Sequence, residues 1–268
     1  MKTARMLVIL VLALTGLGTV AFSQPGEQMM TARWAQHGAP VIDGVMGPTE
    51  WSAAIPFHVT FSQPTTTPGI IPYWLPSPDN PDDLSFTVYS MYDEENLYIA
   101  VDVADDIIID DSPDDLPWFD DDVEIYVDGD QEGNDISGNG PDEVPGKEGF
   151  QLLKDVGGDS GTNSVDEIDW EAAPGFRPRG YVVEFRIALG SIDTQDGEGE
   201  APPGPGSSVG FNVTVGDDDN GGLPYNWDPE SDGSDSYGAW DGSWDTWWYA
   251  REDDWGSLYL EPLPPGLD

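Results

Sequence analysis

The stretch LPWFDDDVEIYVD, residues 116–128, is the segment that decides the fold. From Val123 to Asp128 the letters VEIYVD alternate between apolar and polar residues. A period of two is the pattern of a β-strand that places one face on a core and the other toward polar surroundings. We therefore predict a half-buried strand at this point of the chain.

Trp118 stands just before this strand, beside the three aspartates of residues 120–122. These surroundings are too polar for a fully buried indole, so we expect the ring near the surface. A flat apolar ring gains free energy by covering the C–H face of a sugar, and a carboxylate such as Glu124 can accept the protons of sugar hydroxyls. Two interpretations stay open: Trp118 contacts a ligand, or it folds back as a lid on the core.

The same alternation recurs along the chain and predicts further strands, at 84–91, 97–103, 148–154, 180–189, 209–215 and 255–260. Residues 39–59 are expected to form a strand and a turn and to bury Trp51 against the sheet. The segments between these elements are expected to be loops, at 62–83, 129–147, 155–169 and 217–248. No window longer than one or two turns has a helical period, so we predict an all-β fold, a two-sheet antiparallel β-sandwich (jelly-roll-like) with long acidic loops.

The N-terminal residues 1–23 have the pattern of a secretory signal peptide. Lys2 and Arg5 precede an apolar run, and small residues close the segment. No later stretch approaches the roughly 20 apolar residues that cross a bilayer, so we expect no membrane insertion and a secreted or periplasmic protein. The remaining boundaries that we predict are an N-terminal tail at 24–38, the β-sandwich domain at 39–261 and a C-terminal tail at 262–268.

The chain carries 52 acidic and only 9 basic side chains, which gives a formal net charge of −43. Such a charge repels nucleic acid and anionic membrane surfaces, so we expect neither as a partner. Two explanations of the excess stay open: a surface solvated for salty water, and carboxylate clusters that hold calcium. The chain has no cysteine, which excludes disulfides and Cys-ligated zinc.

Calcium takes six to eight oxygen ligands, which acidic loops at strand ends can supply. We therefore expect a structural calcium ion, although no segment fits the EF-hand pattern. The carboxylates that we predict as ligands come from loops next to the predicted strands: Asp105, Asp106, Asp128, Asp130 and Asp217, with the runs 120–122 and 217–219 as further candidates.

Other chemistries find little support in the sequence. Two acids suffice for glycoside hydrolysis, but with 52 acids in the chain a pair carries little information, and we predict that the protein is not an enzyme. The only histidines are His37 and His58, too few for a histidine-based metal centre. A b-type haem held by His58 and Met91 remains an alternative, against which ordinary packing of both residues is the simpler interpretation.

Residues 240–255 contain five tryptophans. They exceed what one small core can bury, so we expect at least one of them to face a ligand or a partner. The other interpretation is that they brace a long loop against the sheet.

The chain carries, in this order, the segments VIDGVMGPTEW, YDEENLYIAVDVAD, PWFDDDVEIYVD, GYVVEFRIAL, VGFNVTVGDDD and WGSLYL. In order and spacing they resemble the family 9 carbohydrate-binding modules of secreted xylanases and related proteins. This resemblance implies a β-sandwich that holds the end of a sugar chain between two tryptophans, with structural calcium and without catalysis. By position, Trp118 and Glu124 match the first stacking tryptophan and a sugar-contacting glutamate, and Trp248, next to Trp247, matches the second tryptophan.

Asn212 matches a polar position of the family's G-F-N strand, whereas Thr214 stands where the family often has glutamine. That departure leaves the identity of the sugar open. We predict a secreted, non-catalytic protein that binds an oligo- or polysaccharide through Trp118, Glu124, Asn212 and Trp247 or Trp248. The alternatives are a b-type haem domain of the same fold and a surface adhesion or assembly module.

Overall fold

The computed structural model of the chain describes residues 28–60, 78, 80–129, 149–163, 168–192, 202–219, 236–239 and 255–267. Within these ranges the chain forms strands and two short 3-10 helices, η1 (Pro117–Phe119) and η2 (Leu189–Ser191). The strands are β1 (Met29–Trp34), β2 (Phe57–Thr60), β3 (Ser85–Tyr92), β4 (Asn96–Ala104), β5 (Asp122–Asp128), β6 (Gly149–Asp155), β7 (Ser160–Asn163), β8 (Trp170–Arg177), β9 (Gly180–Ala188), β10 (Ser208–Asp217), β11 (Ser236–Ala239) and β12 (Gly256–Leu260). No helix in the described ranges is long and apolar enough to cross a membrane.

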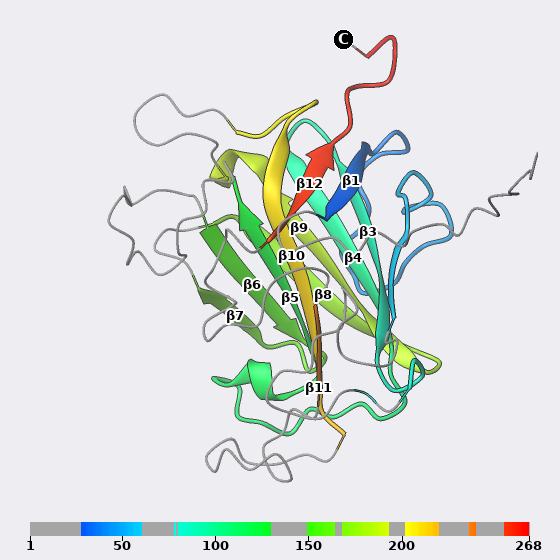
Figure 1. The fold of residues 1–268 in the computed structure, drawn as a ribbon, viewed down its shortest axis with the longest axis vertical. Helices are drawn as coiled ribbons and strands as arrows, with labels where there is room; N and C mark the ends of the chain where they lie inside the picture. Colours follow the sequence, from blue (N-terminus) through cyan, green and yellow to red (C-terminus); the bar gives the residue numbers. More distant parts are fainter. Residues whose placement is uncertain are drawn as a thin grey trace, which may run out of the picture.

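The strands form one continuous sheet with two halves. The β5 half contains β7, β6, β5, β10 and β12 in that order, with β11 paired to β10. The β9 half contains β3, β4, β9 and β8, with β2 paired to β3. Strand β1 joins the halves, because residues 29–32 pair in parallel with β12 and residues 33–34 pair in parallel with β3. Figure 1 shows β12 and β1 between the two halves.

The prediction of an all-β fold is confirmed for the described residues, but its detail changes. We predicted a two-sheet antiparallel β-sandwich; in the structure two halves do face each other across the core, but β1 links them into one curled sheet. Strand β1 is also parallel to both of its neighbours. The reason lies in the N-terminal segment: residues 24–38 were predicted as a tail, but β1 closes the gap between the halves.

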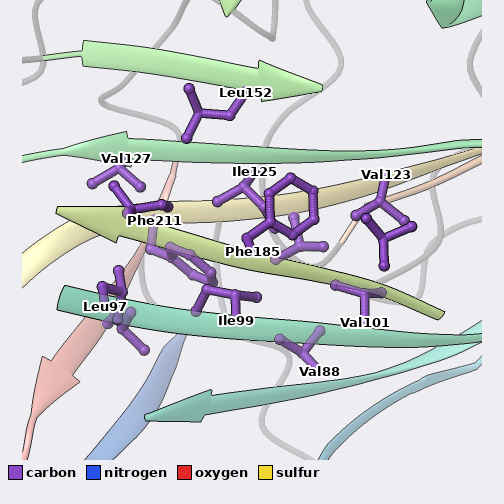
Figure 2. Close-up of a cluster of buried hydrophobic side chains, with 14 of the residues drawn as sticks. Val88, Leu97, Ile99, Val101, Val123, Ile125, Val127, Leu152, Phe185 and Phe211 are labelled. Atoms are coloured by element: carbon purple, nitrogen blue, oxygen red, sulfur yellow. The ribbon is translucent and has the colours of Figure 1, made fainter. Parts of the chain in front are cut away.

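The core lies between the two halves, as Figure 2 shows. Alternation in β5 turns its apolar side chains toward those of β4 and β9. The fully buried side chains that meet there include Val123, Ile125, Val127, Ile99 and Phe185. Burial of each such side chain contributes about 1.5–3 kcal/mol to folding, so this interior is the main source of stability.

The strands that alternate were predicted within one or two residues of their bounds, whereas β1, β7, β8 and β11 were missed. Strand β11 lies in the loop predicted at 217–248. Strand β7 lies in a predicted loop. Strand β8, with the sequence WEAAPGFR, contains Pro174 and has no period of two. It pairs with β9 alone, at the end of the strand order, where a proline without an N–H group is tolerated.

A second apolar cluster covers the outer side of the β9 half, where Trp51 packs with Met91 and Tyr98. Trp51 is 4% exposed, which confirms that it is buried against the sheet. Glu184 of β9 anchors this region. One of its oxygens accepts the N–H groups of Asp43 and Gly44, and the other accepts the indole N–H of Trp51 at 2.8 Å. Both oxygens of Glu184 therefore accept hydrogen bonds that hold the structure together.

Candidate functional site

A row of polar side chains lies on the β5 half, on the face that points away from the core. Glu124 and Tyr126 alternate with the core residues of β5. On β10, Thr214 stands opposite Glu124 and Asn212 opposite Tyr126. On β6, Gln151 stands opposite Tyr126. We call these five residues the polar face.

The polar face is buried except for Gln151, which is partly exposed. This corrects the prediction of a half-buried strand, since every residue of β5 is buried. Side-chain hydrogen bonds compensate these polar groups for the loss of water. The hydroxyl of Tyr126 donates to Oε2 of Glu124. Gln151 Nε2 and Thr214 Oγ1 donate to the same oxygen, and both of these bonds are 3.1 Å long. Because polar groups that bond one another can be buried at little cost, alternation alone does not reveal which faces are exposed.

All three donors converge on one oxygen of Glu124. Its other oxygen, Oε1, accepts no hydrogen bond from any described residue. Burial raises the pKa of Glu124, while the hydrogen bonds from Tyr126, Gln151 and Thr214 oppose that shift. The arrangement therefore presents one oriented acceptor, held by three neutral side chains.

Two aromatic rings lie near the polar face. Trp118 belongs to η1 and is 41% exposed, so its expected place near the surface is confirmed. η1 packs on β6 and β7, where Pro117 lies next to Gly161 and Leu153, and Leu153 stands opposite Glu124. The other ring is Trp255, whose centroid lies 5.3 Å from that of Tyr126.

The structure thus brings together three of the five predicted sugar-contacting residues on one half of the sheet: Trp118, Glu124 and Asn212. Trp247 and Trp248 lie outside the described residues. Sequence reasoning did not name Tyr126 or Gln151, and it included Trp255 only as one of the five tryptophans of residues 240–255. Tyr126 could have been found, since the period of two puts it on the same face as Glu124, whereas the other two required the strand register.

A second feature is a cluster of carboxylates at the end of the sheet where β4 and β10 finish and β5 begins. Asp105, Asp121 and Asp217 are buried and hold carboxylate oxygens within 4.8 Å of one another. Further groups of this kind adjoin it, namely Asp83, Asp217 and Asp219; Asp105, Asp106 and Asp219; Asp110, Asp120 and Asp155; and Asp111, Asp120 and Asp218. In Figure 1 the segment between β4 and β5 lies at the lower end of the sheet.

Burial without a counter-charge perturbs these acids. It raises the pKa of Asp105 to about 7 and, together with the neighbouring Asp105 charge, that of Asp121 to about 10. Oδ2 of Asp105 and Oδ2 of Asp155 are buried and have no hydrogen-bond partner among the described residues. Arginines of the described segments form five ion pairs, with Glu261, Asp82, Asp102, Asp169 and Glu171, and none of these partners belongs to the cluster. Buried carboxylates with unsatisfied oxygens are the donor set that a hard cation such as Ca²⁺ requires.

The predicted calcium ligands divide accordingly. Asp105 and Asp217 belong to the carboxylate cluster, and Asp106 belongs to the adjoining group with Asp105 and Asp219. Asp128 ends β5, pairs with Gly210 and lies at the opposite end of that strand. Asp130 lies outside the described residues. Sequence reasoning did not include Asp83, Asp110, Asp111 or Asp155, because they reach the cluster from loops and strand ends that only the fold brings together.

The two residues of the haem alternative have ordinary partners. His58 is exposed, and its Nδ1 lies 2.8 Å from the hydroxyl of Thr87. Met91 is buried in the cluster that contains Trp51 and Tyr98. Nothing in these contacts favours a haem site.

Comparison with known proteins places this geometry in a family. Structures of a family 9 carbohydrate-binding module from Caldicellulosiruptor kristjanssonii, in complex with cellotriose and with glucose, superpose on this chain with a TM-score of 0.59 at 17% identity. The match covers 90% of this chain and 97% and 100% of the two modules, respectively, and at this identity it shows the fold. A search of curated proteins finds no significant match. Residues 42–261 match the family described as "Carbohydrate family 9 binding domain-like", and the chain therefore belongs to that family.

Proposed function

We propose that this protein binds an oligo- or polysaccharide at the polar face of the β5 half. The observation that carries the proposal is the oriented Glu124 carboxylate, whose Oε2 takes three donors and whose Oε1 takes none among the described residues. Sugar hydroxyls are donors that fit such an acceptor, and a bond to a carboxylate is among the stronger hydrogen bonds in proteins. Gln151 is partly exposed, so the ligand approaches from the β6 side.

The exposed ring of Trp118 supplies the apolar contact of the proposed site. The η1 turn that carries Trp118 packs on β6 and β7 through Pro117, which lies next to Gly161, and this places the turn on the same side of the sheet as Glu124. An indole that stacks on a pyranose covers the C–H face while the carboxylate binds the hydroxyl edge. Trp247 or Trp248 would provide the second ring of the site, as the family resemblance implies.

The proposed role is binding without catalysis. Hydrolysis of a glycosidic bond requires two carboxyl groups on either side of the bond. The other carboxylates on this face of β5, Asp122 and Asp128, are both fully buried. Asp122 also accepts the N–H of Gly216 at 2.9 Å. Glu124 is itself only 3% exposed, so burial does not distinguish it from these two acids. The proposed lack of catalysis therefore rests on the family that residues 42–261 match.

The ligand class and the calcium ion belong to the same proposal. Relatives of known structure were solved with cellotriose and with glucose, which supports a glucan or a related oligosaccharide as the ligand. We assign a structural cation to the carboxylate cluster, with Asp105, Asp121 and Asp217 as ligands, where it would neutralise buried charge. The signal-peptide pattern of residues 1–23 supports export, since polysaccharides are met outside the cell.

A glycan array in calcium-containing buffer tests the proposal, with Glu124→Gln and Glu184→Gln as a matched pair of buried glutamates. In Glu124→Gln the three donors keep the amide oxygen at the Oε2 position, so an NH₂ group replaces the free acceptor. We expect affinity to fall about 10- to 100-fold with the fold intact. Glu184→Gln should instead lower stability, because both of its oxygens accept N–H groups, and leave affinity unchanged. Absence of binding to any glycan, or equal affinity of wild type and Glu124→Gln, contradicts the proposal.

A further inference from the structure

Trp255 lies beside the polar face, although the site described so far gives it no role. It directly precedes Gly256, the first residue of β12, which pairs with Phe211 of β10. Trp255 therefore continues the cross-strand row that runs from Gln151 through Tyr126 to Asn212. Its ring contacts that of Tyr126, with an angle of 55° between the planes.

The indole N–H of Trp255 is buried and has no hydrogen-bond partner among the described residues. The residue itself is only 3% exposed. A buried tryptophan normally places its N–H on an acceptor, because an unmet buried donor destabilises the folded state. Trp51 follows this rule, since its Nε1 donates to Glu184 at 2.8 Å. The indole N–H of Trp51 thus has an acceptor, whereas that of Trp255, next to the polar face, has none among the described residues.

We propose that Trp255 is a specificity-determining residue whose indole N–H donates a hydrogen bond to an oxygen of the bound sugar. The inference rests on the proposed function and deepens it. Glu124 Oε1 offers an acceptor and Trp255 Nε1 a donor, on neighbouring rows of the same face. A sugar hydroxyl both donates and accepts, so this pair of groups fits hydroxylated ligands. A site built in this way discriminates against sugars that lack the hydroxyl, because its own polar groups would then stay unpaired.

The test compares Trp255→Phe with Trp51→Phe, using cellotriose titrations by calorimetry and melting curves. Both changes keep an aromatic ring and delete the N–H. We expect Trp255→Phe to bind cellotriose at least about tenfold more weakly. Both variants lose stability through the smaller ring, but Trp255→Phe should lose less than Trp51→Phe, because only Trp51 gives up a hydrogen bond. Trp51→Phe should leave the affinity unchanged and have the lower melting temperature of the two, because Glu184 loses a partner.

Wild-type protein provides a second measurement that does not depend on how the variant folds. With ¹⁵N-labelled tryptophan, the Trp255 Nε1–H resonance should shift on addition of cellotriose and exchange more slowly with solvent, while that of Trp51 stays in place. An unmoved Trp255 resonance in a protein that does bind, or equal affinity of wild type and Trp255→Phe, overturns the inference alone. A wild type that binds neither cellotriose nor any glycan on the array contradicts the proposed function, and the inference falls with it.

Discussion

Replacing Asp105 by asparagine is expected to stabilise the protein without calcium and to weaken its response to calcium. Asp105 is 2% exposed, and its pKa is raised from 3.8 to about 7, first by burial and also by the charge of Asp219. At about 1.4 kcal/mol per pKa unit, an ionised Asp105 costs up to about 4 kcal/mol of stability at pH 8. Local hydration of the loop reduces this cost, so we expect a gain of about 2–4 kcal/mol.

Asparagine fits the position for a structural reason. Oδ1 of Asp105 accepts the N–H of Ile107 at 2.8 Å, and an amide oxygen can do the same. Oδ2 has no partner among the described residues, and an NH₂ group in its place would donate to the neighbouring carboxylate of Asp121. The substitution therefore removes one buried charge and one possible ligand while the backbone contact remains.

Melting curves in EDTA and in calcium at pH 8 give the assay. In EDTA, Asp105→Asn should melt about 5–10 °C above wild type. Calcium at a hundredfold excess over its Kd should stabilise wild type by about 2.7 kcal/mol and the variant by less, because one ligand is missing. Asp115→Asn, an exposed change on the same loop, serves as the control and should behave like wild type. Two outcomes would refute the reasoning: a variant that melts below wild type in EDTA, or a melting temperature that calcium raises equally in both proteins. Magnesium in place of calcium should have little effect on either melting temperature.

Three further outcomes are expected. In EDTA the wild type should lose stability as pH rises from about 4 to 8. The folded-state pKa of Asp105, about 7, lies above its unfolded pKa, so its contribution to stability is fully present below the unfolded pKa and is lost as pH rises through the folded pKa. Chemical denaturation at several pH values measures this, and a stability that rises over the same interval contradicts it. Trp118→Ala should weaken sugar binding by about 1–3 kcal/mol in calorimetry and leave the melting temperature nearly unchanged, since the ring is 41% exposed; unchanged binding would return Trp118 to a structural role. Gly44→Ala should lower the free energy of unfolding by about 2–4 kcal/mol, because Gly44 has a φ of 77° and a Cβ would overlap the carbonyl of Pro174. An unchanged stability in urea titration would show that the loop around Gly44, which is bonded to Glu184, can shift to accommodate the methyl group.

The sequence predicts those parts of the fold that a period of two determines. Strands such as β5 and β9 alternate because one face meets the core, and that pattern is local. Strand β8 was missed because its place at the end of the sheet tolerates Pro174 and needs no alternation. Strand β1 was missed because its role, to join two halves in parallel, depends on β12 and β3, which lie far along the chain.

The candidate site divides in the same way. The exposure of Trp118 followed from its polar neighbours, and the place of Glu124 on the outward face followed from alternation. The bonds that Gln151 and Thr214 donate to Glu124 did not, because they cross two strand pairs and depend on the strand register. Nor could the unmet N–H of Trp255 be predicted, since only the structure tells which donors lack acceptors.

Location of the sugar on the sheet is the most direct test of the central claim. We would record ¹H–¹⁵N correlation spectra of the wild type, in calcium, during titration with cellotriose or with the tightest glycan on the array. If the sugar binds at the polar face, backbone shifts concentrate in β5, β6 and β10 and at Trp118, while β8, β9 and the cluster around Trp51 and Met91 stay unchanged. Shifts centred on the Trp51 cluster, or a saturating titration without any shift in β5, would contradict this location.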